Sequence, residues 1–231
     1  MEAVQISADS TEPGNTGELV GQLIIRKGSS DSKITFWKKN AGTSGVLTSM
    51  QFEDLDGDGA KDVFIIIPDN GASFSISNYF IYSYKKDMSY SFTSDNNLVD
   101  FINEFSFKYV GNNKLSIISS RQNFSADLAI ELDNDQTPSE DYMKDYEQSA
   151  WIDPVSVDIS ENSRLALTTG ANGIPEIKVP LPVFGLATVD MIGEIDLYFT
   201  IDDSFNPVLK RFEVMDFKGN DKVNVGSCEV K

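Results

Sequence analysis

Short runs rich in β-branched and aromatic residues follow one another from Glu18 onward, and clusters of Gly, Asn, Asp and Ser separate them. This pattern is typical of strands joined by turns. It predicts an all-β fold with about fourteen strands and few short helices. The predicted strands are Leu19–Arg26, Lys33–Lys38, Leu47–Phe52, Asp62–Ile67, Tyr79–Lys85, Phe105–Val110, Lys114–Ser119, Ala126–Leu132, Ile152–Asp158, Arg164–Thr168, Glu176–Val179, Val189–Ile201, Val208–Val214 and Lys222–Val230.

Two of these runs indicate which way their side chains face. In residues 127–133, Leu128, Ile130 and Leu132 alternate with acidic residues or alanine. This alternation predicts an outer strand, at or near a sheet edge, with one face in the core. The run Val63–Ile67 is apolar at every position. A strand that is apolar on both faces is expected in the centre of a sheet.

The polar segments predict how the chain is divided. The polar opening Ser7–Gly17 indicates a flexible N-terminal tether over residues 1–17, which leaves residues 18–231 as one all-β domain. The acidic stretch Asp133–Asp145 interrupts the strand pattern. We interpret it as a connector between two related halves, residues 18–132 and 150–231.

Two segments have helical character. Ser139–Tyr146 follows Thr137-Pro138, and its first turn after a serine is acidic, which predicts a short helix inside the connector. Partial helical spacing within Asn96–Phe105 predicts about two further turns of helix.

Composition narrows the classes of function. The chain has 231 residues, of which 40% are hydrophobic, so it can bury a core. It has 36 acidic and 19 basic residues, and the net charge of −17 repels nucleic acids and anionic lipid surfaces. We therefore expect no nucleic-acid partner. Histidine is absent, which excludes Ser-His-Asp and Cys-His nucleophilic sites, and the single Cys228 cannot form an internal disulfide.

The sequence contains no apolar run of the roughly 18 residues that a membrane-spanning helix needs, so no membrane insertion is expected. Its first residues also lack the basic and apolar regions of an export signal. Either the protein is cytosolic, or the chain begins after a removed signal. The polar opening favours the second option, with an extracellular or cell-surface location and a lipid anchor upstream as one possibility.

The strongest chemical signal is the stretch from Asp54 to Asp62. Aspartates occupy the first, third, fifth and ninth positions of this loop, and two glycines let the backbone turn tightly. Hard carboxylate oxygens at this spacing predict one Ca²⁺ site. The predicted ligands are the side chains of Asp54, Asp56, Asp58 and Asp62 and the backbone carbonyl of Ala60.

Two other structures are compatible with part of the loop sequence. An EF-hand fits its first half, but Ile65 stands at the twelfth position, where an EF-hand has a bidentate glutamate. A metal-free Asp/Gly-rich hairpin turn also explains these residues, since both types are common in turns. The segment Asp158–Ala166 is a weak copy of the loop that has lost most of its carboxylates, so we expect one calcium ion rather than two.

The loop and the strand after it resemble the FG-GAP or VCBS repeats of integrin-like β-propellers, in which a DxDGDGxxD loop binds calcium between adjacent strands of a blade. The whole pattern is similar to a family of uncharacterised secreted proteins and lipoproteins of Gram-positive bacteria. That likeness is carried by Gly21–Ile25, the loop, Tyr79–Tyr84, Asn113–Ile117, Trp151–Pro154 and Val189–Gly193. The resemblance implies export and a propeller-like arrangement of antiparallel sheets, and it implies no particular reaction.

These observations favour a calcium-stabilised extracellular binding module whose partner is a protein or glycan of the cell envelope. A carboxylate-dependent glycan hydrolase and a purely structural envelope protein are the alternatives. The segment Gly170–Pro175 can shape a binding loop, although ordinary turn chemistry also explains it. Five aromatic residues can stack on sugars or pack in sheets: Trp37, Trp151, Tyr79, Tyr82 and Tyr84.

Overall fold

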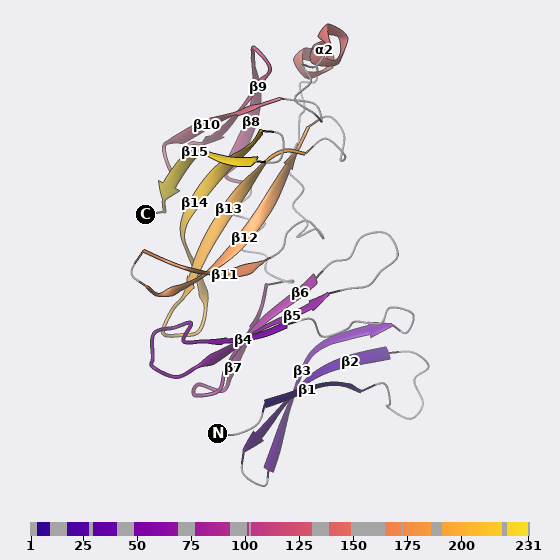
Figure 1. Ribbon diagram of the computed structural model, residues 1–231, viewed down its shortest axis with the longest axis vertical. Helices are drawn as coiled ribbons and strands as arrows, with labels where there is room; N and C mark the ends of the chain where they lie inside the picture. Colours follow the sequence, from indigo (N-terminus) through magenta and orange to yellow (C-terminus); the bar gives the residue numbers. More distant parts are fainter. Residues whose placement is uncertain are drawn as a thin grey trace. The chain divides into compact units, whose positions relative to one another are not determined.

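Antiparallel strands account for most of the described residues in the computed structural model (Figure 1). The structure describes residues 4–9, 18–27, 30–40, 49–68, 77–92, 101, 103–130, 139–148, 165–171, 173–185, 191–218 and 221–230. The strands are β1 (Val4–Asp9), β2 (Glu18–Lys27), β3 (Ser30–Asn40), β4 (Ser49–Glu53), β5 (Asp62–Pro68), β6 (Ser77–Ser83), β7 (Met88–Ser91), β8 (Phe105–Gly111), β9 (Lys114–Ser119), β10 (Phe124–Ala129), β11 (Ala166–Thr169), β12 (Pro175–Phe184), β13 (Met191–Ile201), β14 (Pro207–Lys218) and β15 (Asp221–Glu229). The helix α2 spans Glu140–Gln148. The all-β prediction is confirmed.

The described strands form four antiparallel sheets, with the orders β1-β2-β3, β4-β5-β6-β7, β10-β9-β8 and β11-β12-β13-β14-β15. Each is a meander, because neighbouring strands in the sheet are also neighbours in the chain. The chain divides into two compact units, one of Met1–Glu53 and Asp62–Ser94, the other of Asp54–Lys61 and Asp95–Lys231. This division differs from the two halves expected on either side of the acidic stretch.

The first unit contains the sheets β1–β3 and β4–β7. Residues Val4–Asp9 pair with β2 as an outer strand, so this part of the expected tether is a strand. β5 lies inside its sheet, and Val63, Phe64 and Ile65 are at most 3% exposed. The predicted central position of this apolar run is therefore confirmed.

The core of the second unit lies between the sheets β8–β10 and β11–β15. The ring of Phe212 in β14 makes edge-on contacts with Phe105 and Phe124 of the smaller sheet, at centroid distances of 5.2 and 4.8 Å. Asp216 is buried, and its Oδ1 accepts a hydrogen bond of 3.1 Å from the backbone N–H of Ala129. Aromatic packing and this hydrogen bond join the two sheets.

The strand β10 behaves as its alternation predicts. It lies at the edge of its sheet, with Ala126 and Leu128 buried and Asp127 exposed. The sheet β11–β15 has a glycine, Gly193 of β13, where β10 packs against it. A Cβ placed on Gly193 would lie 2.6 Å from Leu128 Cδ1. The edge-strand prediction is confirmed, and glycine at position 193 allows the close approach of the two sheets.

The helix α2 confirms the expectation for Ser139–Tyr146. The carbonyl of Ser139 accepts the N–H of Met143 at 3.0 Å, and the acidic residues Glu140 and Asp141 occupy the first turn, where the helix dipole favours them. In the described part of the chain, no helix is long and apolar enough to cross a membrane. The strand expected at Ile152–Asp158 and most of the helix expected within Asn96–Phe105 lie outside the described residues.

Candidate functional site

The predicted metal loop connects β4 to β5 and begins where their pairing ends. Glu53 and Asp62 are the last residues in register between the two strands. Between them, Gly57 and Gly59 have φ values of 74° and 82°, a left-handed conformation that side chains rarely adopt. The two glycines therefore curl the backbone twice within three residues. Leu55 is 1% exposed, so one apolar side chain of the loop is buried.

The carboxylates of the loop are held by its own backbone. Asp54 Oδ2 accepts the N–H of Gly59 at 2.9 Å, Asp56 Oδ1 accepts that of Asp58 at 3.1 Å, and Asp58 Oδ1 accepts that of Ala60 at 2.8 Å. These bonds use one oxygen of each carboxylate to fix the direction in which the other oxygen points. The loop is therefore preorganised by hydrogen bonds that a turn of this kind makes locally.

Three of the predicted ligands come together. One carboxylate oxygen from each of Asp54, Asp56 and Asp58 lies within 4.8 Å of the other two, and this cluster could hold a metal ion. Asp54 Oδ1 is buried and accepts no hydrogen bond from any described residue. A buried carboxylate oxygen without a donor is costly, and a bound cation would satisfy it.

The two other predicted ligands are placed differently. Asp62 is the first residue of β5 and is fully buried, and it is not among the three residues that cluster. Ala60 donates its N–H to Asp58, as described above. The weak copy of the loop at Asp158–Ala166 lies outside the described residues except for its last two positions.

A row of buried charges on the sheet β11–β15 was not anticipated from the sequence. One face of this sheet is apolar and packs in the core, while the opposite face carries several charged or polar residues: Glu176 and Lys178 of β12, Glu194, Asp196 and Tyr198 of β13, and Arg211 and Glu213 of β14. Glu176, Glu194 and Asp196 are nevertheless only 7%, 4% and 1% exposed. Alternation usually indicates that the polar face lies in water, but here these three carboxylates are buried.

Arg211 organises one end of this row. Its Nη2 donates to Glu176 Oε2 at 3.0 Å, its Nη1 contacts Glu213 Oε1, and its guanidinium carbon lies 3.5 Å from the centroid of the Tyr198 ring. The Tyr198 hydroxyl donates to Glu213 Oε2 at 3.0 Å. Burial raises the pKa of Tyr198, and the nearby carboxylates of Asp196 and Glu213 raise it further. The cluster fixes the guanidinium on three sides.

The other end of the row contains two carboxylates and two lysines. Lys178 Nζ lies 2.6 Å from Asp196 Oδ2 and 3.9 Å from Glu194 Oε1, and Lys222 Nζ lies 2.7 Å from the same Glu194 oxygen. Burial raises the pKa of Asp196 to about 7, the neighbouring Glu194 carboxylate acts in the same direction, and Lys178 opposes the change. The Asp196 carboxyl can therefore retain a proton near neutral pH.

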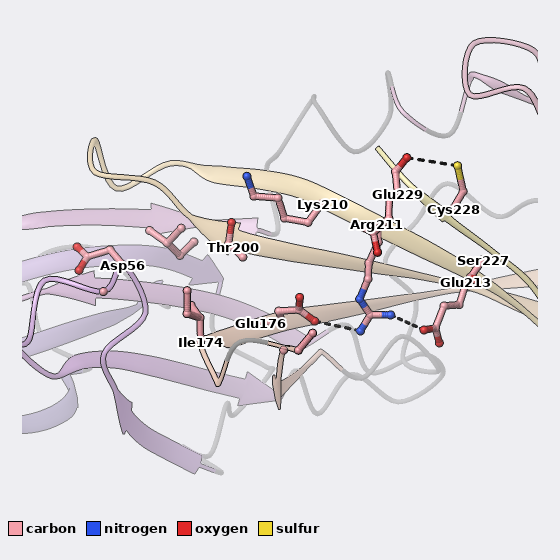
Figure 2. A pocket seen from close by; sticks show the side chains of 14 residues that line it. Asp56, Ile174, Glu176, Thr200, Lys210, Arg211, Glu213, Ser227, Cys228 and Glu229 are labelled. Atoms are coloured by element: carbon pink, nitrogen blue, oxygen red, sulfur yellow. Dashed lines mark hydrogen bonds and ion pairs between the residues drawn. The ribbon is translucent and has the colours of Figure 1, made fainter. Parts of the chain in front are cut away.

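A cavity of about 690 Å³ opens at the Arg211 end of this sheet (Figure 2). Its walls include Glu176, Arg211 and Glu213, the exposed residues Lys210 and Glu229, and the turn between β11 and β12 with Gly170 and Ile174. The segment Gly170–Pro175, which the sequence suggested as either a binding loop or a plain turn, thus borders a cavity. The only cysteine of the chain, Cys228, also lines it.

Two of the aromatic residues that could stack on sugars, Tyr79 and Tyr82, do not lie at this cavity. Tyr79 and Tyr82 are 1% and 4% exposed, so both pack inside the unit that contains the β4–β7 sheet. The Tyr82 hydroxyl donates to Asp87 Oδ1 at 2.8 Å. The side chains of Trp37 and Trp151 lie outside the described residues.

No protein-family model, no curated protein and no solved structure matches this chain, so the likeness to FG-GAP or VCBS repeats rests on the sequence of the loop and of the strand that follows it.

Proposed function

We propose that this chain is a calcium-stabilised binding module of the bacterial cell envelope, with a protein or a glycan as its partner. The observation that carries the calcium part is the convergence of Asp54, Asp56 and Asp58 to within 4.8 Å. Carboxylate oxygens suit a hard cation, and calcium accepts six to eight of them at about 2.3–2.6 Å. Asp62 and the carbonyl of Ala60 would complete the ligand set that the sequence predicts.

The propeller-like arrangement belongs to the same proposal. The sheet β4–β7 is a four-stranded antiparallel meander, which is the composition of a propeller blade. The metal loop joins the first two strands of this meander, as in the repeats that the sequence resembles. The three-stranded and five-stranded sheets have no such counterpart, so the support comes from one sheet.

The ion's role would be to stabilise the fold rather than to take part in a reaction. A cation that binds only the native state stabilises it by mass action, and clustered carboxylates repel one another when no cation is present. Extracellular calcium is concentrated enough to fill a site with a Kd of about 10⁻⁴–10⁻³ M. The excess of acidic residues, with a net charge of −17, supports a partner other than nucleic acid.

Retention on isolated Gram-positive cell walls in millimolar calcium tests the proposal. We expect the wild type to be retained, and the Asp56→Ala/Asp58→Ala variant or the wild type in chelator to be released. The Asp127→Ala/Asp141→Ala variant removes the same charge at two exposed positions and should behave as the wild type.

The same samples separate the alternatives. Soluble glycan fragments released by the wild type would favour a hydrolase. If the walls release the wild type and both variants equally, and no soluble glycan fragments appear, the result would favour a structural protein and contradict the binding function.

A further inference from the structure

The cavity beside Arg211 has a rigid polar wall. Arg211 is held by Glu176 and Glu213 and lies on the Tyr198 ring, so the carboxylates on either side of it are fixed in place. Figure 2 shows the guanidinium of Arg211 between these two glutamates, all three among the residues that line the cavity. Its volume of about 690 Å³ falls in the range of about 300–1,000 Å³ found for ligand pockets.

A glycine positions one of these carboxylates. A Cβ placed on Gly170 would lie 2.8 Å from Glu176 Oε1, so the turn admits the carboxylate only because no side chain stands there. The turn itself is closed by hydrogen bonds from Gly170 N–H to the Ile174 carbonyl and from Gly173 N–H to the Gly170 carbonyl, both 2.9 Å. Glu176 is thus held between Arg211 and the turn.

The charges of these walls favour a cationic ligand. The sheet contributes three carboxylates, Glu176, Glu213 and Glu229, and the metal loop contributes Asp56, against the two cations Lys210 and Arg211. Two of the carboxylates already pair with Arg211, so an anionic ligand could reach Arg211 only by displacing one of them. The net charge of −17 attracts cations to the whole molecule and repels anions.

The apolar part of the cavity suits a long aliphatic side chain. Ile174 is 44% exposed at the edge of the cavity, and Ile201 also lines it. Lysine and arginine side chains place an aliphatic stem along apolar surface while the charged head reaches carboxylates. The described lining includes no aromatic ring on which a sugar could stack.

We propose that this cavity binds a basic peptide segment, with a lysine or arginine side chain directed toward Glu176 and Glu229. The inference rests on the proposed binding function and deepens it by naming the binding surface and the charge of the partner.

Calorimetric titration with tetra-lysine, in calcium and at physiological salt, tests the site. We expect one tetra-lysine per chain. Glu229→Gln, which removes an exposed carboxylate of the cavity, should weaken the affinity about tenfold. Gly170→Ala retains every charge but displaces the Glu176 carboxylate, and should weaken it by a similar factor. Asp127→Asn is the matched control, because it removes one exposed carboxylate on β10, and should change the affinity less than about twofold.

Cys228 supplies a second readout, because it is the only cysteine and it lines the cavity. Bound tetra-lysine should slow its alkylation by a maleimide. Three results would overturn the inference. They are the absence of tetra-lysine binding, an equal loss of affinity in Asp127→Asn and Glu229→Gln, and tighter binding of tetra-glutamate or a neutral oligosaccharide. If tetra-lysine fails while cell walls still retain the chain, the site is wrong and the binding function stands. If both fail, both are wrong.

Discussion

Replacing Asp196 with asparagine tests the buried charge row most directly. Asp196 is 1% exposed, and burial raises its pKa from 3.8 to about 7. Glu194 and Tyr198 on its own strand, Lys178 on β12 and Glu213 opposite it on β14 are the titratable groups around it. The Asp196→Asn substitution would retain the shape of the side chain and remove its titration.

The sign of the effect follows from proton linkage. A folded-state pKa above the unfolded value means that the native state holds the proton more tightly. The contribution to stability is complete below about pH 4 and is lost as the pH rises to about 7. A tenfold difference in proton affinity is worth about 1.36 kcal/mol, so the wild type should lose on the order of 4 kcal/mol over this interval. The Asp196→Asn variant should not lose it.

Urea unfolding followed by circular dichroism at a series of pH values measures the difference. The stability of Asp196→Asn relative to the wild type should rise by this amount between about pH 4 and pH 7. The Asp127→Asn variant controls for the loss of one negative charge at an exposed position of β10. Parallel curves for the wild type and Asp196→Asn would refute the reasoning, because they would mean that no proton is retained at this site.

Two further predictions concern the loop and the packing of the sheets. Calcium at about 100 times its Kd should stabilise the native state by about 2.7 kcal/mol, which raises Tm by about 5–11 °C for a chain of this size. Added calcium should not change the Tm of the Asp56→Ala/Asp58→Ala variant. Equal melting of the wild type with and without chelator would contradict the metal site. Gly193→Ala should lower the free energy of unfolding by about 1–3 kcal/mol in urea titrations, because its Cβ would meet Leu128 at 2.6 Å and the Met215 carbonyl at 2.7 Å. Unchanged stability would contradict the close packing of β10 on β13.

Local patterns predicted the elements well. Alternation placed β10 at a sheet edge, and the apolar run Val63–Ile67 gave a central strand. The acidic first turn after Ser139 gave α2. These features depend on neighbours in the sequence, which is why a single chain reveals them. The strand Val4–Asp9 escaped prediction because a long polar segment follows it, although Val4, Ile6 and Ala8 alternate with polar residues as in a strand.

The two candidate sites differ in the same respect: neighbours in the sequence form the metal loop, whereas strand pairing forms the cavity. The convergence of Asp54, Asp56 and Asp58 follows from loop spacing and two glycines, so the sequence alone indicated it. The cavity beside Arg211 gathers residues from β12, β13, β14 and β15, from the turn between β11 and β12 and from the metal loop. No spacing in the sequence predicts which charges meet across strands, since that depends on register and on which strands are neighbours.

The sequence by itself determined the all-β class, the direction in which several strands face and the carboxylate loop, because hydrophobic periodicity and turn chemistry act over a few residues. Only the tertiary structure decided that Glu176, Glu194 and Asp196, on the polar face of β12 and β13, are buried. Alternating charges in a single strand look the same whether they face water or partners on other strands. Ion pairs such as Lys178 with Asp196 and Arg211 with Glu176 distinguish the two cases, and they exist only once the strands are aligned.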